Sequence, residues 1–240
     1  MEDSNKIGRS DNLPTHVHYL LHWAQKSPNR EFLIQPLPTG EVIKFTWQQV
    51  ADEVKRMAAY LQAMNLPQRS QIAIFGKNSA HWIMADLAIW MSGHISVPLY
   101  TTLNADGTKY VLEHSESKVL FIGKLDGVGD SWNEVKGIIP NDMPCIRLPL
   151  APDYDAITWD DIVAKTQPTA SPYLPQAQEL ATIIYTSGST GLPKGVMQSY
   201  ETLLSPAAEL KGTFGVTSDD RALSYLPLCA TSMDQVLPRD

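Results

Sequence analysis

Cysteine is scarce in this chain. Cys145 and Cys229 are the two cysteines among its 240 residues. Two cysteines cannot build the disulfide framework of a small secreted protein, and these two do not form the closely spaced pairs that bind structural zinc. A reducing cytosol is therefore the expected compartment.

A surplus of positive charge is also missing. The chain has 19 Lys and Arg against 26 Asp and Glu, which gives a formal net charge of −7 at pH 7. Proteins that bind nucleic acids present a basic face to the phosphate backbone. We therefore expect no nucleic-acid partner and turn to small molecules.

Long hydrophobic runs are absent as well. The first residues, Met-Glu-Asp-Ser-Asn-Lys-Ile, contain charges in place of the apolar core of a signal peptide. The most apolar helix candidate, residues 82–91, is interrupted by Asp86 and is far shorter than the ~20 residues that a membrane span requires. We expect a cytoplasmic protein whose contact with a membrane, if it has one, is peripheral at the inner face.

What the chain does contain is an alternation of helical and strand patterns. Thr46 and Gln49 form a capping-box pattern, and apolar residues then recur at helical spacing up to residue 64. Strands separated by crossover helices pair in parallel, so the sequence predicts an α/β fold with layered sheets and flanking helices. Pro98 predicts that its strand lies at a sheet edge or ends there. The expected helices cover residues 14–26, 47–64, 79–91, 104–113, 131–138 and 199–211, and the expected strands cover residues 71–75, 95–99, 118–122 and 221–226.

The most informative segment is a loop rich in glycine and small hydroxyl residues. It reads Tyr-Thr-Ser-Gly-Ser-Thr-Gly-Leu-Pro-Lys over residues 185–194 and lies between the apolar runs 181–184 and 196–197. Gly188 and Gly191 lack a Cβ, so the backbone can adopt positive φ and turn consecutive N–H groups toward an anion. This backbone is suited to surrounding a phosphate group.

Side chains of the same loop can neutralise phosphate. Ser187, Ser189 and Thr190 carry hydroxyl donors that rotate toward phosphate oxygens. Lys194 adds a positive charge, and hydrogen bonds to charged groups contribute about 1.5–3 kcal/mol each. Pro193 fixes φ just before the lysine and limits the freedom of the loop. The sequence therefore predicts a preorganised phosphate-binding loop.

Two well-known phosphate-binding patterns do not match this loop. The P-loop of nucleoside triphosphatases needs Gly-x-x-x-x-Gly-Lys, and Pro193 stands where its second glycine would be. The dinucleotide fingerprint Gly-x-Gly-x-x-Gly fails because Thr190 occupies its second glycine. The alternative interpretation is a flexible connection between two strands with a solvated lysine. The particular order of the residues favours phosphate binding.

The run Tyr-Thr-Ser-Gly-Ser-Thr-Gly-Leu-Pro-Lys-Gly-Val-Met resembles the signature of the AMP-forming acyl-adenylate enzymes. This superfamily includes acyl-CoA synthetases, luciferases and the adenylation domains of peptide synthetases. Four further stretches resemble its long-chain fatty acyl-CoA synthetase branch, with less specific motifs, at residues 45–50, 97–102, 114–121 and 223–228. The likeness extends over most of the chain.

The resemblance implies a two-step acid–thiol ligation. A fatty carboxylate attacks the α-phosphorus of MgATP with release of pyrophosphate, and the thiol of coenzyme A then displaces AMP from the acyl-adenylate. The implied substrates and cofactors are therefore fatty acid, ATP, coenzyme A and Mg²⁺, and no catalytic residue is assigned. By position in the motif, the β- and γ-phosphates would be held by Thr186, Ser187, Gly188, Ser189, Thr190, Gly191 and Lys194, with Thr186 also contacting Mg²⁺.

The resemblance also predicts the domain organisation. We expect a polar tail over residues 1–12, a partial AMP-binding domain over residues 13–228 and a divergent tail over residues 229–240, without the small C-terminal domain of the family. The later adenine, ribose and C-terminal lysine motifs of the family are not found before Asp240. We therefore expect an N-terminal fragment, out of frame or prematurely stopped near its end and inactive as a ligase by itself. The alternative is a catalytically silent nucleotide- or polyphosphate-binding module, or a non-functional gene fragment.

Three histidines and one cysteine are expected to have structural roles. His18 and His22 share one face of the first helix with His16 nearby, but the sequence places no further ligand beside them. Solvated histidines on an amphipathic helix are therefore expected in place of a metal site. Cys229 has no identifiable partner base and is predicted to be a small buried thiol.

Overall fold

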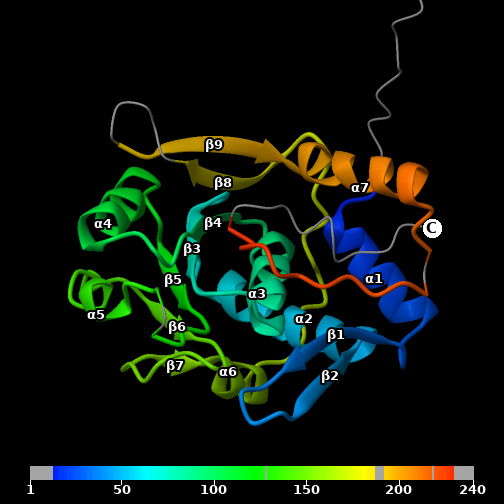
Figure 1. Cartoon of the computed structure of the whole chain (residues 1–240), viewed down its shortest axis with the longest axis horizontal. Helices are drawn as coiled ribbons and strands as arrows, with labels where there is room; N and C mark the ends of the chain where they lie inside the picture. Colours follow the sequence, from blue (N-terminus) through cyan, green and yellow to red (C-terminus); the bar gives the residue numbers. More distant parts are fainter. Residues whose placement is uncertain (1–12, 128, 187–191, 218, 230–240) are drawn as a thin grey trace, which may run out of the picture.

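A seven-stranded sheet forms the centre of the molecule in the computed structural model, which describes residues 13–127, 129–186, 192–217 and 219–229 (Figure 1). The first six strands in spatial order run parallel, and the outermost strand β9 is antiparallel to β8. The spatial order is β7 (Ile157–Thr158), β6 (Cys145–Arg147), β5 (Val119–Ile122), β3 (Gln71–Phe75), β4 (Ile95–Leu99), β8 (Leu180–Thr186) and β9 (Lys194–Ser199). The expected α/β architecture is confirmed.

Helices cover both faces of this sheet (Figure 1). Along β3 the side chains alternate: Ile72 and Ile74 pack with α1, α2, α3 and α6, whereas Ala73 and Phe75 pack with α4 and α5. Alternation with burial on both sides is typical of parallel strands between two helical layers. The helices are α1 (His16–Lys26), α2 (Trp47–Ala63), α3 (Ala80–Met91), α4 (Ala105–His114), α5 (Trp132–Val135), α6 (Trp159–Lys165) and α7 (Tyr200–Phe214).

The central helix α3 is buried on nearly every side. Its sequence, Ala-His-Trp-Ile-Met-Ala-Asp-Leu-Ala-Ile-Trp-Met, has one half-exposed residue, His81. The Ser79 side chain caps its start by accepting a hydrogen bond from the Trp82 N–H at 3.1 Å. A helix that is apolar all round belongs in the interior of a protein. The apolar run over residues 82–91 thus belongs to a core helix.

The position of β4 corrects the expectation based on Pro98. This strand lies inside the sheet, between β3 and β8, and Pro98 pairs with Ile74 of β3. Proline is tolerated here because the ladder between β4 and β8 contains one pair, Ser96 with Thr182. The proline ring therefore removes no ladder hydrogen bond on the β8 side.

A small antiparallel sheet of β1 (Glu31–Pro36) and β2 (Val42–Thr46) was not predicted from the sequence. Its connection contains Gly40 at φ +86°, a left-handed conformation that glycine adopts without steric cost. The signal was present as a Pro-Thr-Gly turn between two runs rich in β-branched and aromatic residues.

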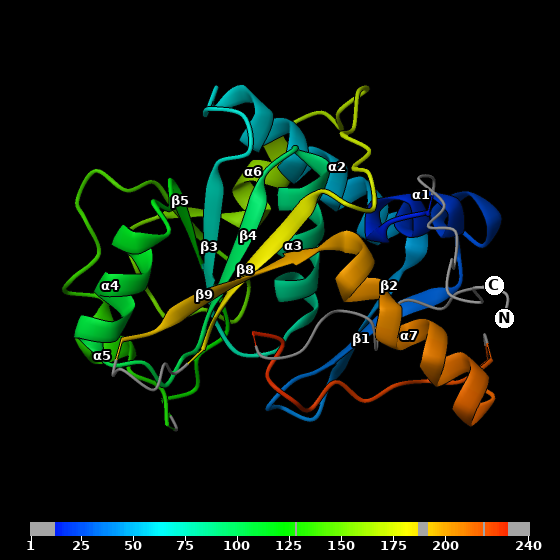
Figure 2. The same ribbon diagram turned by 90° about the horizontal axis from the view of Figure 1, so that it is seen from above.

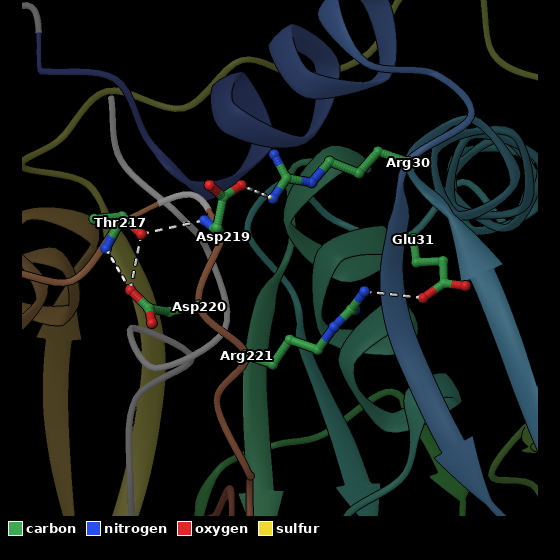
Figure 3. Close-up of polar contacts among 6 residues, drawn as sticks. All are labelled: Arg30, Glu31, Thr217, Asp219, Asp220 and Arg221. Carbon is green, nitrogen blue, oxygen red and sulfur yellow. Dashed lines mark hydrogen bonds and ion pairs between the residues drawn. The ribbon is translucent and has the colours of Figure 1, made fainter.

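The strand expected over residues 221–226 does not form. This segment instead runs past the start of β1, where Arg30 and Asp219 lie 3.3 Å apart and Arg221 and Glu31 lie 3.1 Å apart (Figure 3). Arg30 and Glu31 thus each form an ion pair with a residue of the later segment. Farther along, backbone groups of Ser224, Leu226 and Leu228 form hydrogen bonds with the Asn78 side chain instead of with another strand.

The histidines of α1 differ from the expectation in one respect. His16 is fully buried, with its ring 4.9 Å from the ring of Trp90, whereas His22 is exposed. His18 lies at intermediate depth and its Nδ1 bonds to the Thr15 hydroxyl at 2.9 Å. The expectation of solvated histidines was therefore wrong for His16, because α1 packs closely against α3. Among the described residues, none of the helices has the length and apolar content needed to cross a membrane.

Candidate functional site

The predicted phosphate loop is carried by the β8–β9 hairpin at one side of the sheet (Figure 2). Thr186, the last residue of β8, lies directly opposite Lys194, the first residue of β9. Directly opposite residues of an antiparallel pair present their side chains on the same face. The structure therefore brings these two predicted phosphate ligands together, and both are exposed. The other five, Ser187, Gly188, Ser189, Thr190 and Gly191, lie outside the described residues.

In the preceding pair of the hairpin, the Tyr185 side chain is buried and Gly195 is exposed. Tyr185 is 3% exposed. A Cβ atom added to Gly195 would lie 2.9 Å from Ile183 Cγ2 and 3.2 Å from Tyr185 Cζ. Because real Cβ atoms do not approach other atoms so closely, this position must be glycine for the tyrosine ring to lie across β9. Gly195 is thus a structural requirement of the site that the sequence analysis did not recognise.

The loop follows the carboxyl end of β8, which runs parallel to β4 and pairs with it at Ser96 and Thr182. In open α/β sheets ligands bind outside the carboxyl ends of the strands. Burial raises the pKa of Tyr100, and the buried Cys229 nearby adds to that rise. Because Tyr100 directly follows β4, the segment before residue 230 reaches the same edge. Burial raises the pKa of Cys229 itself to about 11, as expected for an inert buried thiol.

Asn78 holds that last segment in place. Its Nδ2 group donates hydrogen bonds to the carbonyl oxygen of Leu226 at 2.7 Å and to the carbonyl and hydroxyl oxygens of Ser224, both at 3.2 Å. Its Oδ1 atom accepts the N–H of Leu228 at 3.0 Å. Sequence reasoning missed this residue; the available signal was a polar residue in the loop between a buried strand and a buried helix.

Magnesium was predicted to contact Thr186. Mg²⁺ prefers oxygen ligands and is usually held by one or two protein groups together with substrate phosphates and water. An exposed hydroxyl beside a lysine at the start of the loop fits that donor set. Within the part of the chain that the structure describes, no group of three or more His, Cys, Asp or Glu residues could hold a metal ion by itself.

Comparison with known proteins identifies the family of this chain. Residues 20–233 match the family model described as AMP-binding enzyme. A CoA ligase for a bicyclic indenyl-propanoate from Mycobacterium tuberculosis is 30% identical over 206 residues, which is 81% of this chain and 40% of that protein. Long chain acyl-CoA synthetase 4 of Arabidopsis thaliana is 29% identical over 238 residues, which is 89% of this chain and 35% of that protein. The chain thus spans well under half the length of these relatives.

Among solved structures, o-succinylbenzoate CoA synthetase of Bacillus subtilis, in complex with its acyl-adenylate intermediate, superposes with a TM-score of 0.67. It is 26% identical, and the match covers 88% of this chain and 50% of that chain. The resemblance inferred from the glycine-rich loop is thereby confirmed. The chain belongs to the AMP-binding enzyme family, whose members include AMP-forming acid–thiol ligases.

Proposed function

We propose that this chain supplies the polyphosphate-binding part of an AMP-forming fatty acid–CoA ligase. The observation that carries the proposal is the pairing of Thr186 with Lys194 across the β8–β9 hairpin, at the carboxyl edge of the sheet. This pairing brings the two ends of the Ser-Gly-Ser-Thr-Gly segment together, as a loop that surrounds a phosphate requires. The solved relative that contains an acyl-adenylate supports the same chemistry.

In this proposal the loop acts by neutralising charge. When the carboxylate attacks the α-phosphorus, negative charge accumulates on the departing β- and γ-phosphates. In the bound complex, the Lys194 ammonium and the hydroxyl and N–H groups of residues 186–191 would stabilise that charge. Thr186 would contribute one oxygen to Mg²⁺, which supplies further positive charge at the same phosphates.

The acyl group and the compartment are also part of the proposal. The relatives named above act on different acids, one bicyclic and one long-chain, at similar identity to this chain. We favour a long-chain fatty acid because stretches such as residues 223–228 resemble that branch. The free thiols of Cys145 and Cys229 support a reducing, cytoplasmic location.

The test is calorimetric titration of the 240-residue chain with pyrophosphate and with MgATP. Removing a charge-assisted contact should weaken binding by about 10- to 100-fold in Lys194→Ala. Lys165→Ala on α6 is the control, because this lysine is 74% exposed and belongs to a helix far along the chain from the loop. Equal affinities for wild type and Lys194→Ala, or no binding by wild type, would contradict the proposal.

The share of the relatives that this chain covers favours a second candidate, a polyphosphate-binding module without ligase activity. The match spans 35–40% of the two relatives, so most of their residues have no counterpart here. We therefore expect the 240-residue chain to bind pyrophosphate but not to exchange it into ATP in the presence of a fatty acid. Exchange that Lys194→Ala abolishes would instead establish ligase chemistry in the chain itself.

A further inference from the structure

We propose that His114, at the end of α4, is a positioning residue for the phosphate loop: it holds the Tyr185 hydroxyl and so fixes the root of the β8–β9 hairpin. The inference rests on the proposed function of that loop. It assigns a role to a histidine that the sequence analysis placed at the start of a branch-like stretch, residues 114–121, without giving it a function.

The contact between the two side chains is close and oriented. His114 Nδ1 and the Tyr185 hydroxyl oxygen lie 2.7 Å apart and share a hydrogen bond. The rings meet edge to face, with centroids 5.7 Å apart and an interplanar angle of 89°. Tyr110, one turn earlier on α4, packs on the His114 ring, with the two ring centroids 5.2 Å apart. Tyr185 is thus held by a polar contact as well as by packing.

The hairpin needs such an anchor because its ladder support ends early. β8 pairs with the interior strand β4 at Thr182, four residues before Thr186. Beyond that pair its ladder partner is β9, the outer strand of the sheet, whose Val196 and Met197 are 40% and 68% exposed. The loop-bearing end of the hairpin therefore depends on side-chain contacts for its position relative to the sheet.

Tyr185 is the residue through which that position can be set. Its backbone is paired with Gly195, and its ring lies across β9, where only a glycine leaves space. Moving the ring therefore moves both strands at the point where they enter the loop. Thr186 and Lys194, the next pair, would move with them.

α4 supports this anchor and lies beside the loop-bearing end of the hairpin (Figure 2). The Asn104 side chain caps its first turn by accepting the Gly107 N–H at 2.9 Å. Val111 and Leu112 are buried in the core on that face of the sheet. His114 follows directly on the same helix, so its imidazole is held at a fixed distance from the sheet. The hydrogen bond to Tyr185 transmits that distance to the hairpin.

The experiment is a double-mutant cycle with Tyr185→Phe and His114→Phe, which remove the hydrogen bond but keep aromatic rings. Two quantities are measured: the dissociation constant for pyrophosphate, and the hydrogen–deuterium exchange of the β9 amides without ligand. Each single variant should raise the dissociation constant about three- to tenfold, as expected for loss of one hydrogen bond, and should speed exchange. The double variant should be no worse than the single variants, because both remove the same bond.

Tyr173→Phe is the matched control. Its hydroxyl donates to Glu179 Oε2 at 2.5 Å, near the opposite end of β8 from the loop. This variant should leave both the pyrophosphate affinity and the β9 exchange as in wild type. His114→Asn, whose amide can occupy the place of Nδ1, should restore part of the affinity that His114→Phe loses.

The two readouts separate the inference from the function on which it rests. If wild type does not bind pyrophosphate, the proposed function fails, and the exchange of the β9 amides still decides whether His114 positions the hairpin. Unchanged exchange in Tyr185→Phe, or additive effects in the double variant, would overturn the inference. A Tyr173→Phe variant that behaves like Tyr185→Phe would also overturn it, because the effect would then be general.

Discussion

Gly195 has a hydrogen atom where other amino acids have the Cβ carbon. We predict that Gly195→Ala destabilises the protein by about 1–3 kcal/mol, because the added methyl group would overlap Ile183 and Tyr185 and force them to move. Urea denaturation measures the change. Gly137→Ala is the control, since its added methyl group would meet its nearest atom, Glu134 O, at an ordinary 3.8 Å. Equal stability of the two variants would contradict the proposed packing of Tyr185.

Asp86 is a carboxyl group buried in the core. It lies on α3 at 4% exposure, and within the described residues its Oδ1 atom has no hydrogen-bond partner. Burial raises its pKa to about 7, although the nearby Ser96 hydroxyl opposes that shift. Burial raises the pKa of Tyr200 of α7, and the nearby Asp86 adds to that rise. A carboxyl group in this setting is more stable protonated than charged.

This burial predicts a pH-dependent stability. The folded protein binds a proton at Asp86 more tightly than the unfolded chain does, so the contribution is fully present below about pH 4 and is lost as the pH rises to about 7. A shift of about three pKa units corresponds to roughly 4 kcal/mol. Asp86→Asn should flatten that part of the stability profile, measured by denaturation at several pH values.

At the scale of elements, the segment after α7 is held by a side chain where a strand was expected. Asn78 satisfies backbone groups at Ser224, Leu226 and Leu228 from the loop between β3 and α3. Hydrogen bonds of this kind let an extended segment remain in place without a ladder partner. The ion pairs of Arg30 and Arg221 contribute less, because exposed pairs are worth little in water (Figure 3).

We therefore predict that Asn78→Ala releases this segment. Leu223 and Tyr225 are already 78% and 74% exposed, so chymotrypsin should cleave there faster once the backbone is freed. Global stability should fall by about 1–3 kcal/mol, because partner groups lose their hydrogen bonds. Asn133→Ala on the exposed side of α5 is the control. Cleavage at the wild-type rate in Asn78→Ala would show that other contacts hold the segment.

At the scale of the whole molecule, two helical layers enclose a sheet whose carboxyl edge carries the candidate site. Tyr100, directly after β4, and Cys229, in the segment before residue 230, meet at that edge although they are distant in sequence. The outer strand β9 exposes Met197, and the hairpin gains its position from α4 on one face. The candidate site thus lies at the edge of the sheet, whereas the helix that supports it, α4, belongs to a helical layer.

Much of the fold and of the candidate site could be predicted from local sequence patterns. Apolar periodicity placed α2, β3, α3, α4 and β5 within a few residues of their observed bounds, because it reports which residues of an element are buried. The residues of the phosphate loop were recognisable because their order is specific to one chemistry. The β1–β2 hairpin was not predicted, and β4 was wrongly expected at a sheet edge. Both failures arise because strand pairing depends on residues elsewhere in the chain.

The amino-acid sequence by itself determined the α/β class, the family and the composition of the phosphate loop, since each depends on residues that are near neighbours. Only the tertiary structure decided that His16 is buried, that Asn78 holds Leu226 and that His114 meets Tyr185. The physical reason is that these contacts join residues 71 to 148 positions apart, or two separate helices, and no local periodicity specifies which distant partner a side chain will meet.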